Sequence, residues 1–323
     1  MSKKKDNIVT PRAFIKYDDL AGELDILSKY IGIFAKIAGK TIVIKCGNGV
    51  LTNREAMYSM AKDIAVLQSS GVRVIVVHGG GAKIGEMLKI VGGLEKFIDG
   101  ERVIDEAHFH IIEMVLKGSI APHIVSDINH VGGVAISISG RDNNFIKTDK
   151  MRRIKKDPGS EIERIVELGL VGEPISMDLN FLDTIFENGM VPVISPIGIN
   201  DIGKAYVMNA DVLAGFIAEQ TQADLLLFLT DFDGISNAEG NILNKISSEK
   251  LKILIDSDAV HQELKIKAIS SISALKNGVG SCSIVNGNEH HITLIDLLKD
   301  EGVGTVIFKN MANNVKSLFP IVW

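Results

Sequence analysis

Residues 74–81 read VIVVHGGG, so that strand-forming residues lead directly into a histidine and three consecutive glycines. Glycine allows the backbone to approach a ligand closely, and its N–H groups can point toward a phosphate. The helix that we expect to begin at Ala82 adds a partial positive charge at its N-terminus. Gly79, Gly80 and Gly81 therefore suit an anion, although a tight turn between a strand and a helix also uses glycine.

A second turn of this kind follows an earlier apolar run, IVIKCGNG at residues 42–49. Lys45 ends the expected strand, and Gly47, Asn48 and Gly49 form the turn. A lysine in this place can simply extend its ammonium group to solvent. However, the carboxyl edge of an open α/β sheet is also where ligands bind. Two glycine turns and a lysine at one edge indicate a phosphate site, although the P-loop and G-x-G-x-x-G motifs are both absent.

Seven short apolar runs predict buried strands, because they are rich in β-branched residues or leucine and do not alternate with polar residues. They are TIVIK (41–45), RVIVV (73–77), VAISIS (134–139), VPVIS (191–195), LLLFL (225–229), CSIV (282–285) and TVIF (305–308). Amphipathic helical stretches lie between them, at residues 53–71, 209–223 and 261–278. This alternation predicts an α/β fold with an open, mainly parallel sheet sandwiched between helices.

The chain divides into four predicted segments. Residues 1–38 form an N-terminal extension with a helix that either packs on its own domain or docks on another subunit. Residues 39–195 and 196–310 form two lobes, with a boundary where Pro and Gly interrupt the pattern at 195–201, and 311–323 are a tail. The basic run 150–157 lacks interleaved aromatic residues, so we expect a hairpin or loop there.

Composition narrows the function classes. A net charge of −5 over 323 residues argues against a nucleic-acid partner. The sequence contains neither a secretory signal nor an apolar run long enough to cross a membrane, so a cytoplasmic location is expected. Cys46 and Cys282 form neither a metal-ligand spacing nor a disulfide framework, and no protein metal site is predicted. We expect Cys46 to be a small, partly buried residue at a strand end rather than a reactive thiol.

In order and spacing, these segments together resemble the amino acid kinase family over about residues 38–310. The segments that carry the resemblance are GKTIVIKCGNG (39–49), VIVVHGGGAKIGEML (74–88), DGERVID (99–105), EMVLKG (113–118), SGRDN (139–143), GLVGEP (169–174), NGMVPVISPIG (188–198), MNADVLAG (208–215), LLFLTDFDGI (226–235), IKAISSISALKNGVGS (266–281) and DEGVGTVI (300–307). Within the family they are most similar to members that phosphorylate N-acetyl-L-glutamate.

The resemblance implies that ATP phosphorylates the side-chain carboxylate of N-acetyl-L-glutamate to an acyl phosphate, a step of arginine biosynthesis. The lobe 39–195 would bind the acceptor and phosphates, and 196–310 would bind ATP, with Mg²⁺ carried by the nucleotide. A carboxylate is ionised at neutral pH, so the reaction needs positioning and charge stabilisation but no general base. His78 is then a structural or positioning residue. The alternatives are a kinase of a related N-acylated amino acid or other carboxylate, and a non-catalytic regulatory relative that kept the fold.

The resemblance also implies roles for individual residues. Lys45 and Lys267 would neutralise charge on the transferring group, and Asp211 would orient them. The expected phosphate contacts are Gly47, Asn48, Gly79 and Gly80. The expected acceptor contacts are Gly80, Gly81, Arg102 and Asn209. The expected nucleotide contacts are Thr230, Asp231, Asp233 and Gly234.

Four positions depart from the family pattern. Asn48 replaces a glycine but keeps its N–H, and Ala121 and Pro122 stand where the family often has Asn-Lys. Val207 replaces an asparagine that helps to hold the acylated head of the acceptor, a loss of about 1–3 kcal/mol of recognition. Residues 262–264, Gln-Glu-Leu, replace Gly-Gly-Met, which predicts a less flexible segment beside Lys267.

The two ends of the chain resemble arginine-inhibited members of the family. Those members carry an N-terminal helix that interlaces between dimers to build a hexamer, so we expect a homo-oligomer, either a dimer or a hexamer. His291, Glu301 and Gly302 are the candidate effector residues. The alternative for His291 is that it starts or caps the helix HITLIDLLKD (291–300).

Overall fold

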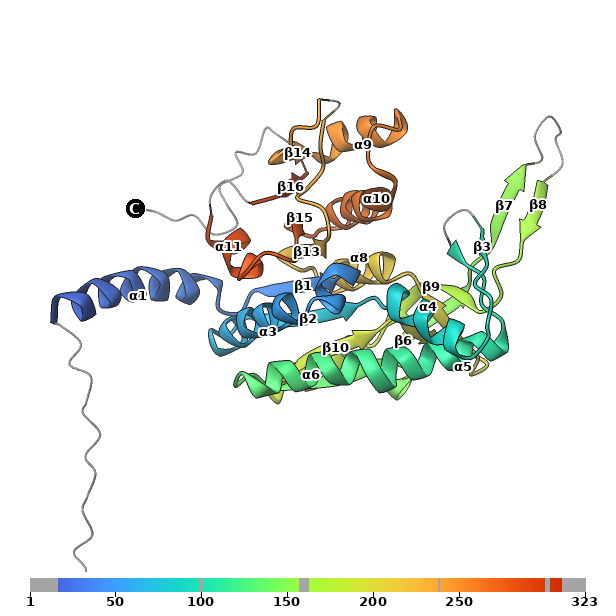
Figure 1. Cartoon of the computed structure of the whole chain (residues 1–323), viewed down its shortest axis with the longest axis horizontal. Helices are drawn as coiled ribbons and strands as arrows, with labels where there is room; N and C mark the ends of the chain where they lie inside the picture. The colour runs from blue at the N-terminus through green and yellow to red at the C-terminus, as the bar shows by residue number, and fades with distance from the viewer. Residues whose placement is uncertain (1–16, 99–100, 157–162, 238, 300–302, 310–323) are drawn as a thin grey trace, which may run out of the picture.

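The computed structural model describes residues 17–98, 101–156, 163–237, 239–299 and 303–309. Its centre is an eight-stranded sheet (Figure 1) in which all seven predicted strands take part. In spatial order the strands are β14 (Lys245–Ser247), β16 (Thr305–Phe308), β15 (Ser281–Asn286), β13 (Leu225–Thr230), β1 (Thr41–Cys46), β2 (Arg73–His78), β10 (Val191–Ser195) and β5 (Ala135–Ser139). The predicted open, mainly parallel α/β sheet is confirmed.

Strand β16 corrects one detail of that prediction, because it runs antiparallel to β15. Thr305 pairs with Ile284, so β16 begins beside the end of β15 instead of at the opposite edge of the sheet. The short helix α11 (Ile292–Leu298) between them does not return the chain to the other edge. Strand β14, which was not predicted, pairs in parallel with β16.

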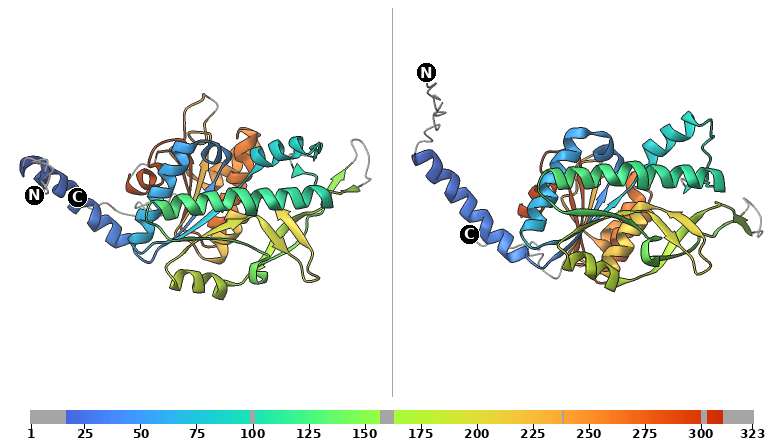
Figure 2. Two further views of the ribbon diagram at one scale, coloured as in Figure 1. Left: turned by 60° about the horizontal axis from the view of Figure 1, so that its bottom comes forward. Right: turned by 90° about the horizontal axis from the view of Figure 1, so that it is seen from below.

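Helices cover both faces of the sheet, as Figures 1 and 2 show. Alternate residues of one strand enter different cores: Ile42 and Ile44 of β1 lie in one buried cluster and Val43 in the other. This explains why the strands are continuous apolar runs. The first core is covered by α3 (Arg54–Ser69), α6 (Ala121–His130) and α11, and the second by α7 (Leu179–Glu187), α8 (Ala210–Gln220), α9 (Ser248–Asp256) and α10 (Gln262–Lys276).

A single rod of helix is formed by α5 (Glu106–Val115), a π-helical turn at Leu116–Ile120 and α6. Its buried stripe repeats every fourth residue: Ile112, Leu116, Ile120, Ile124 and Ile128 are each at most 5% exposed. Such a stripe would drift by about 40° at every step of a regular α-helix. The π turn, marked by the bond from Ala121 N to Leu116 O, accommodates one extra residue and returns the stripe to the core. Pro122, which has no N–H to donate, follows directly.

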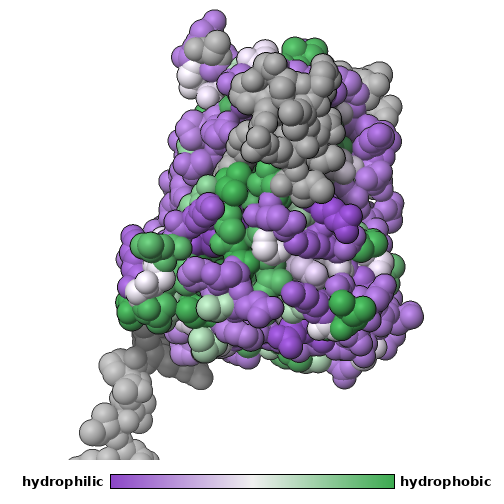
Figure 3. Space-filling view, turned by 90° about the vertical axis from the view of Figure 1, so that its right-hand side faces the viewer, coloured by the Kyte–Doolittle hydropathy of each residue, from purple (hydrophilic) through white to green (hydrophobic). Residues whose placement is uncertain are grey.

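A small closed barrel, which was not predicted, adjoins the carboxyl edge of the sheet. Its strands are β11 (Ile197–Ile199), β12 (Ala205–Met208), β9 (Val171–Met177) and β6 (Ile146–Lys150). Two hairpins lie nearby: β3 (Phe97–Ile98) with β4 (Glu101–Arg102), and β7 (Arg153–Lys156) with β8 (Glu163–Val166). The second hairpin confirms the prediction for the basic run. The face on this side is mainly hydrophilic, with an apolar strip down its centre (Figure 3).

Helix α1 (Tyr17–Ile37) precedes the sheet and projects from the body (Figures 1 and 2). Ile33 and Ile37 near its C-terminus are buried, whereas Leu24, Leu27 and Ile31 are more than half exposed. Among the described residues, no helix is both long and apolar enough to cross a membrane. The lobe boundary near residues 195–201 stays a prediction.

Candidate active site

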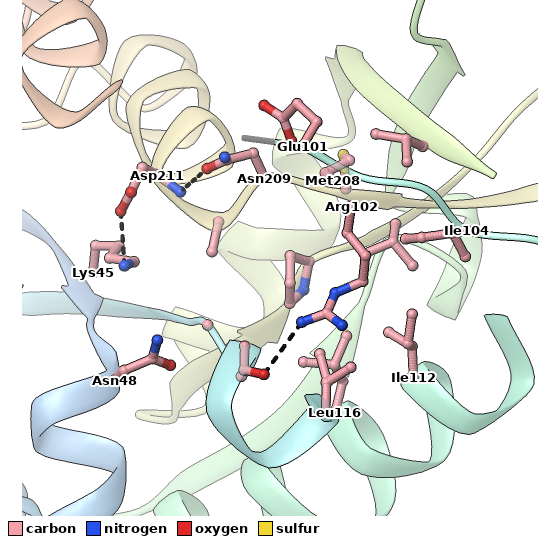
Figure 4. Close-up of a pocket in the computed structure, with 18 of the residues that line it drawn as sticks. Lys45, Asn48, Glu101, Arg102, Ile104, Ile112, Leu116, Met208, Asn209 and Asp211 are labelled. Atoms are coloured by element: carbon pink, nitrogen blue, oxygen red, sulfur yellow. Dashed lines mark hydrogen bonds and ion pairs between the residues drawn. The ribbon is translucent and has the colours of Figure 1, made fainter. Parts of the chain in front are cut away.

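Asp211 lies between two lysine ammonium groups that are far apart in the sequence. Lys45 is the penultimate residue of strand β1, and its Nζ lies 2.7 Å from Asp211 Oδ1 (Figure 4). Lys267 is on α10, and its Nζ lies 3.0 Å from Asp211 Oδ2. Asp211 itself is in the first turn of α8, where its N–H donates to the side chain of the N-cap residue Asn209 at 2.9 Å. The structure therefore brings together the two lysines and the aspartate that the sequence singles out.

This cluster is buried and carries a net positive charge. The side chains of Lys45, Lys267 and Asp211 are only 8%, 12% and 11% exposed. Burial by itself raises the pKa of the Asp211 carboxyl, but the charges of Lys45 and Lys267 outweigh burial, so that pKa lies below its ordinary value. Two ammonium groups and one carboxylate leave one positive charge in a region of low dielectric, which an anionic ligand would neutralise.

Two helices begin at the glycine turns without a side-chain cap. Helix α4 (Gly81–Ile90) has Gly80 as its N-cap residue, and α2 (Asn48–Thr52) has Gly47. Six other helices are capped by side chains, namely Asn53, Asp105, Asp178, Asn209, Ser247 and His261. The first backbone N–H groups of α2 and α4 are thus donors for a bound anion at the edge that carries Lys45.

Close packing explains why the turns need glycine. A Cβ atom on Gly47 would lie 2.3 Å from the carbonyl oxygen of Leu229, and one on Gly80 would lie 2.6 Å from Cδ1 of Ile120 and 2.9 Å from Cδ2 of Leu116. The N–H of Gly79 donates to Cys46 O at 3.1 Å, which leaves Gly80 and Gly81 as backbone donors at this turn.

His78 supports the glycine turn from behind. Its ring is fully buried, with Nδ1 2.8 Å from the carbonyl oxygen of Gly79 and Nε2 2.9 Å from Ser195 Oγ. Burial lowers the pKa of His78 to about 4, with a smaller contribution from the charge of Lys45. The neutral ring therefore donates from Nδ1 and accepts the Ser195 hydroxyl at Nε2, which fits the predicted positioning role.

Arg102 and Asn209, the predicted acceptor contacts, line the same cavity as the lysines (Figure 4). The guanidinium group of Arg102 pairs with Glu95, donates to Gly81 O at 3.3 Å and lies 4.9 Å from the centre of the Phe97 ring. These contacts hold it in place and leave further N–H groups for a ligand. Asn209 uses its oxygen to cap α8, so its amide NH₂ is the end that can donate to an acceptor.

The cavity has a volume of about 420 Å³ and two chemically different ends. The lysines, Asp211 and the glycine turns form one end, with Asn48 beside them. The other end is an apolar wall, which we define as Ile104, Ile112, Leu116, Val171, Val207 and Met208. Of these, sequence reasoning singled out Val207 alone, because the others are ordinary core residues that no motif distinguishes.

The four predicted nucleotide residues lie outside this cavity. Thr230 ends β13, the strand that pairs with β1, so the stretch 230–234 leaves the sheet at the same edge as Lys45. Asp231 accepts a bond from Asn288 at 3.4 Å, and Asp233 accepts one from Asn286 at 2.8 Å. Gly234 is buried against Thr305. In the described part of the chain, no group of three or more His, Cys, Asp or Glu residues is arranged to hold a metal ion.

The altered segment 262–264 forms the first turn of α10, with His261 as N-cap. Leu264 is buried, and Glu263 lines the cavity while its carbonyl oxygen accepts a bond from Lys267 Nζ at 3.1 Å. Lys267 thus extends from a regular helix, and the lower flexibility beside it stays a prediction.

Of the candidate effector residues, Glu301 and Gly302 lie outside the described residues. His291 directly precedes α11, in agreement with the helix-start alternative. Its N–H donates to Ser59 Oγ at 2.7 Å, and its ring Nδ1 lies 2.6 Å from Asp63 Oδ1. Burial raises the pKa of Asp63, and the contact with His291 partly offsets this effect.

Comparison with known sequences gives relatives along most of the chain. The model of the Amino acid kinase family matches residues 40–286. An acetylglutamate kinase of Hahella chejuensis is 39% identical over 282 residues, which are 87% of this chain and 93% of the relative. An acetylglutamate kinase of Rhizobium johnstonii is 40% identical over 282 residues, which are 87% of this chain and 96% of the relative.

Solved structures share the fold at lower sequence identity. An N-acetylglutamate synthase from Neisseria gonorrhoeae, complexed with coenzyme A and N-acetyl-glutamate, superposes with a TM-score of 0.76 at 21% identity and covers 89% of this chain and 63% of its own. A carbamate kinase from Giardia lamblia bound to AMP-PNP gives a TM-score of 0.59 at 15% identity, covering 84% of this chain and 99% of its own.

Proposed function

The chain belongs to the amino acid kinase family, and we propose that it transfers the γ-phosphoryl group of ATP to the side-chain carboxylate of N-acetyl-L-glutamate. Relatives named acetylglutamate kinase, 35–40% identical over 87–89% of the chain, support this reaction and its place in arginine biosynthesis. The observation that carries the proposal is the carboxylate of Asp211 bridging Lys45 and Lys267 beside two uncapped helix N-termini.

The reaction requires charge stabilisation more than proton transfer. A carboxylate oxygen of the acceptor attacks the γ-phosphorus, the bond from that phosphorus to the β–γ bridging oxygen breaks, and ADP leaves with the electron pair. A glutamate side chain, with a pKa near ~4.3, is already ionised at neutral pH, so no base removes a proton. Lys45 and Lys267 neutralise the phosphoryl oxygens, while Asp211 keeps the two ammonium groups together.

Backbone groups complete the phosphate end. The N–H groups at Gly47, Asn48, Gly80 and Gly81 stand at the uncapped starts of α2 and α4 and donate to phosphate oxygens. Gly79 contributes by having no side chain to fill the turn. Thr230, Asp231, Asp233 and Gly234, which leave the sheet at the same edge, contact the nucleotide, which brings Mg²⁺ with it.

Arg102 and Asn209 bind the acceptor at the other side of the phosphate end. The α-carboxylate of N-acetylglutamate pairs with the guanidinium group of Arg102, which Glu95 and Phe97 hold in position. The amide of Asn209 donates to the acceptor from the N-terminus of α8. Two anionic groups of one substrate are thus bound by opposite sides of the cavity.

The test measures the product directly. Purified chain, Mg-ATP and N-acetylglutamate are incubated with hydroxylamine, which converts an acyl phosphate to a coloured hydroxamate, while a coupled assay follows ADP. We expect hydroxamate and ADP in equal amounts, and neither without acceptor. ADP release without hydroxamate would indicate hydrolysis of ATP and contradict the proposal.

A panel of acceptors separates the remaining alternatives. If other carboxylates give hydroxamate and N-acetylglutamate does not, the chain is a kinase of a different acceptor. If folded protein gives no hydroxamate with any acceptor, the chain is a non-catalytic relative of the family.

The proposal includes a homo-oligomer built through α1. Leu24, Leu27 and Ile31 are 51%, 53% and 57% exposed and recur at spacings of three and four, which is typical of a helix that packs on another helix. We assign this stripe to α1 of a second copy. Light scattering on the parent and on Leu27→Glu tests this: the parent should form a dimer or a hexamer, and the variant a smaller species.

Arginine is the candidate effector, with His291, Glu301 and Gly302 as the candidate residues. Arginine should lower the rate of the parent and act less strongly on His291→Ala, whereas equal inhibition of both would contradict a role for His291. A cytoplasmic location also stays a prediction, which cell fractionation would test.

A further inference from the structure

We propose that the protein also phosphorylates acceptors whose α-carboxyl group is uncharged, such as an α-carboxamide, and that Glu95 is the residue that sets this tolerance. This inference rests on the proposed function, because it names a further class of acceptor for that reaction. It concerns the surroundings of Arg102, which we call the acceptor end, and a substrate group that does not react. The phosphate end has the same task with either class of acceptor.

Arg102 already has an anionic partner within the protein. It forms an ion pair with Glu95, and the two side chains are only 15% and 21% exposed. Of the two, Arg102 lines the cavity and Glu95 does not, so the pair leaves the cavity side of the guanidinium group open to a ligand. The other contacts of this group, with Gly81 O at 3.3 Å and with the Phe97 ring, bring no charge. The charge of Arg102 is therefore balanced before an acceptor arrives.

Helix α4 keeps Glu95 in this place. A Cβ atom on Gly85 would clash with Oε1 of Glu95, so the carboxylate lies directly against the backbone of the helix. Its other oxygen, Oε2, makes the ion pair with Arg102. Arg102 in turn donates to Gly81 O, one turn earlier in the same helix. An acceptor that displaced Glu95 would leave a largely buried carboxylate without this partner, which is costly. We therefore expect Glu95 to stay paired when the acceptor binds.

A second acidic side chain lies at the acceptor end. Glu101 precedes Arg102 on β4, lines the cavity and is 8% exposed (Figure 4). The acceptor end thus has two acidic side chains and one guanidinium group, whereas the phosphate end has two ammonium groups and one carboxylate. The charge balance is opposite at the two ends, and the phosphate end alone has an excess of positive charge for an anion.

A neutral carboxamide can use such an acceptor end. Its carbonyl oxygen accepts hydrogen bonds from the remaining N–H groups of Arg102, as a carboxylate oxygen does. A carboxylate adds Coulomb attraction to the guanidinium group, but it also meets the repulsion of Glu95 and Glu101 and loses more hydration. Because these effects oppose each other, the hydrogen bonds decide the affinity and the charge of the acceptor group adds little.

The experiment compares N-acetyl-L-glutamate with its α-amide, in which the reacting side-chain carboxylate is unchanged, on the full chain. The coupled assay of ADP gives kcat/KM for each acceptor, and hydroxylamine confirms the acyl phosphate. We expect the two values to lie within about tenfold of each other, since a guanidinium group without opposing charges would favour the carboxylate by about 100- to 1,000-fold. A preference of more than about tenfold for the carboxylate would overturn the inference.

Glu95→Gln tests the residue that sets the tolerance. Glutamine keeps the shape and an acceptor oxygen for Arg102 but removes the charge. We therefore expect the preference for N-acetylglutamate over its α-amide to rise about tenfold, through a lower KM for N-acetylglutamate at a similar kcat. A merely structural role of Glu95 would weaken both acceptors alike and leave the ratio unchanged. Glu95→Met, which also removes the charge, serves if the glutamine variant does not fold.

The matched control is Glu113→Gln. Glu113 also forms an ion pair with an arginine, Arg141, and its side chain is also 21% exposed, but it lies on α5 and does not line the cavity. Removal of its charge should leave the ratio of the two kcat/KM values as it is in the parent. An equal rise in the control would refute a specific role for Glu95.

The outcomes distinguish this inference from the proposed function. No ADP and no hydroxamate with either acceptor would contradict the proposed function itself. Normal turnover of N-acetylglutamate with an α-amide that is more than about tenfold poorer would leave the proposed function intact and refute the inference. An unchanged ratio in folded Glu95→Gln or Glu95→Met would refute the role of Glu95.

Discussion

The two ends of the cavity are lined by different kinds of residues. The phosphate end concentrates charge and backbone donors, and its lysines and aspartate come from the end of strand β1, the start of helix α8 and the second turn of helix α10. The apolar wall consists of ordinary core side chains, one of which is only half-buried. We predict from this comparison that a change at one of the few charged residues of the phosphate end affects the reaction far more than a change at any single side chain of the apolar wall.

The largest effect should follow from removing charge at the phosphate end. Lys45→Met removes one of two ammonium groups that face the transferring phosphoryl, so we expect kcat to fall about 10³-fold. Steady-state kinetics of hydroxamate formation measures this. The matched control is Lys40→Met, at the other end of the same stretch, where Nζ lies 2.6 Å from Asp224 and is partly exposed. Activity of the control should stay within twofold, and an equal loss in both variants would contradict a special role for Lys45.

A smaller effect should follow from filling the turn that joins the two ends. Gly80→Ala places a methyl group 2.6 Å from Ile120 Cδ1, so the start of α4 or the wall must move. We expect a loss of about 1–3 kcal/mol of unfolding free energy and a rise in the KM for ATP of tenfold or more. The control is Gly118→Ala. Gly118 lies in the π turn that also contains Ile120, but nothing lies within 4 Å of the methyl group that this change adds. If both variants behave alike, packing against Gly80 does not position the turn.

A pH-dependent effect should come from the ring behind the glycine turn. Because the folded pKa of His78 is about 4 and its ordinary value is 6.5, the unfolded state binds the proton first as the pH falls. The stability associated with the neutral ring is fully present above pH 6.5 and decreases toward pH 4, by about 3 kcal/mol. Urea unfolding of the parent and of His78→Gln between pH 4.5 and 7.5 measures the difference. The control is His123→Gln, at an exposed ring, which should leave the dependence of the unfolding free energy on pH as it is in the parent. If the unfolding free energies of the parent and of His78→Gln decrease in parallel as the pH falls, the prediction is wrong.

The smallest expected effect is the absence of a reaction at the thiols. Cys46 and Cys282 are fully buried, and burial raises the pKa of both, to about 12 for Cys46. Iodoacetamide at pH 7.5 should therefore leave the native chain unmodified, as mass spectrometry would show, and alkylate both thiols in urea. Rapid alkylation of native Cys46, which follows Lys45, would mean that the phosphate end opens.

The sequence predicted the central sheet because its strands carry a strong physical signal. Both faces of β1, β2 and β13 are covered, so these strands are nearly uninterrupted apolar runs. The glycine turns and Lys45 were recognisable for a related reason, since glycine and a buried charge are costly away from a ligand or a special backbone. Lys267 and Asp211 were found through the family resemblance, because a lysine or aspartate in a helix is not distinctive by itself.

The barrel and the apolar wall escaped prediction for the opposite reason. Strand β6, IKTDK, is short and mostly polar, and β9 contains Gly172 and Pro174, both of which weaken a strand signal. Closure of the barrel depends on pairings between residues that are distant in sequence, such as Val171 with Val207. The direction of β16 likewise depends on the edge of the sheet at which α11 ends, and no local sequence pattern specifies this edge.

The π turn at residues 116–120 amounts to one spare residue stored inside a helix. Deleting one residue there would restore regular winding and leave the two halves of the rod facing as they do now, because the π turn already absorbs the roughly 100° that one extra residue adds to a regular helix. Deleting a residue from a regular turn on either side would instead rotate one half of the rod by about 100°, and part of the buried stripe that includes Ile112 and Ile124 would then point to solvent. We therefore expect a one-residue deletion to be tolerated inside the π turn and to destabilise the rod anywhere else between its two ends.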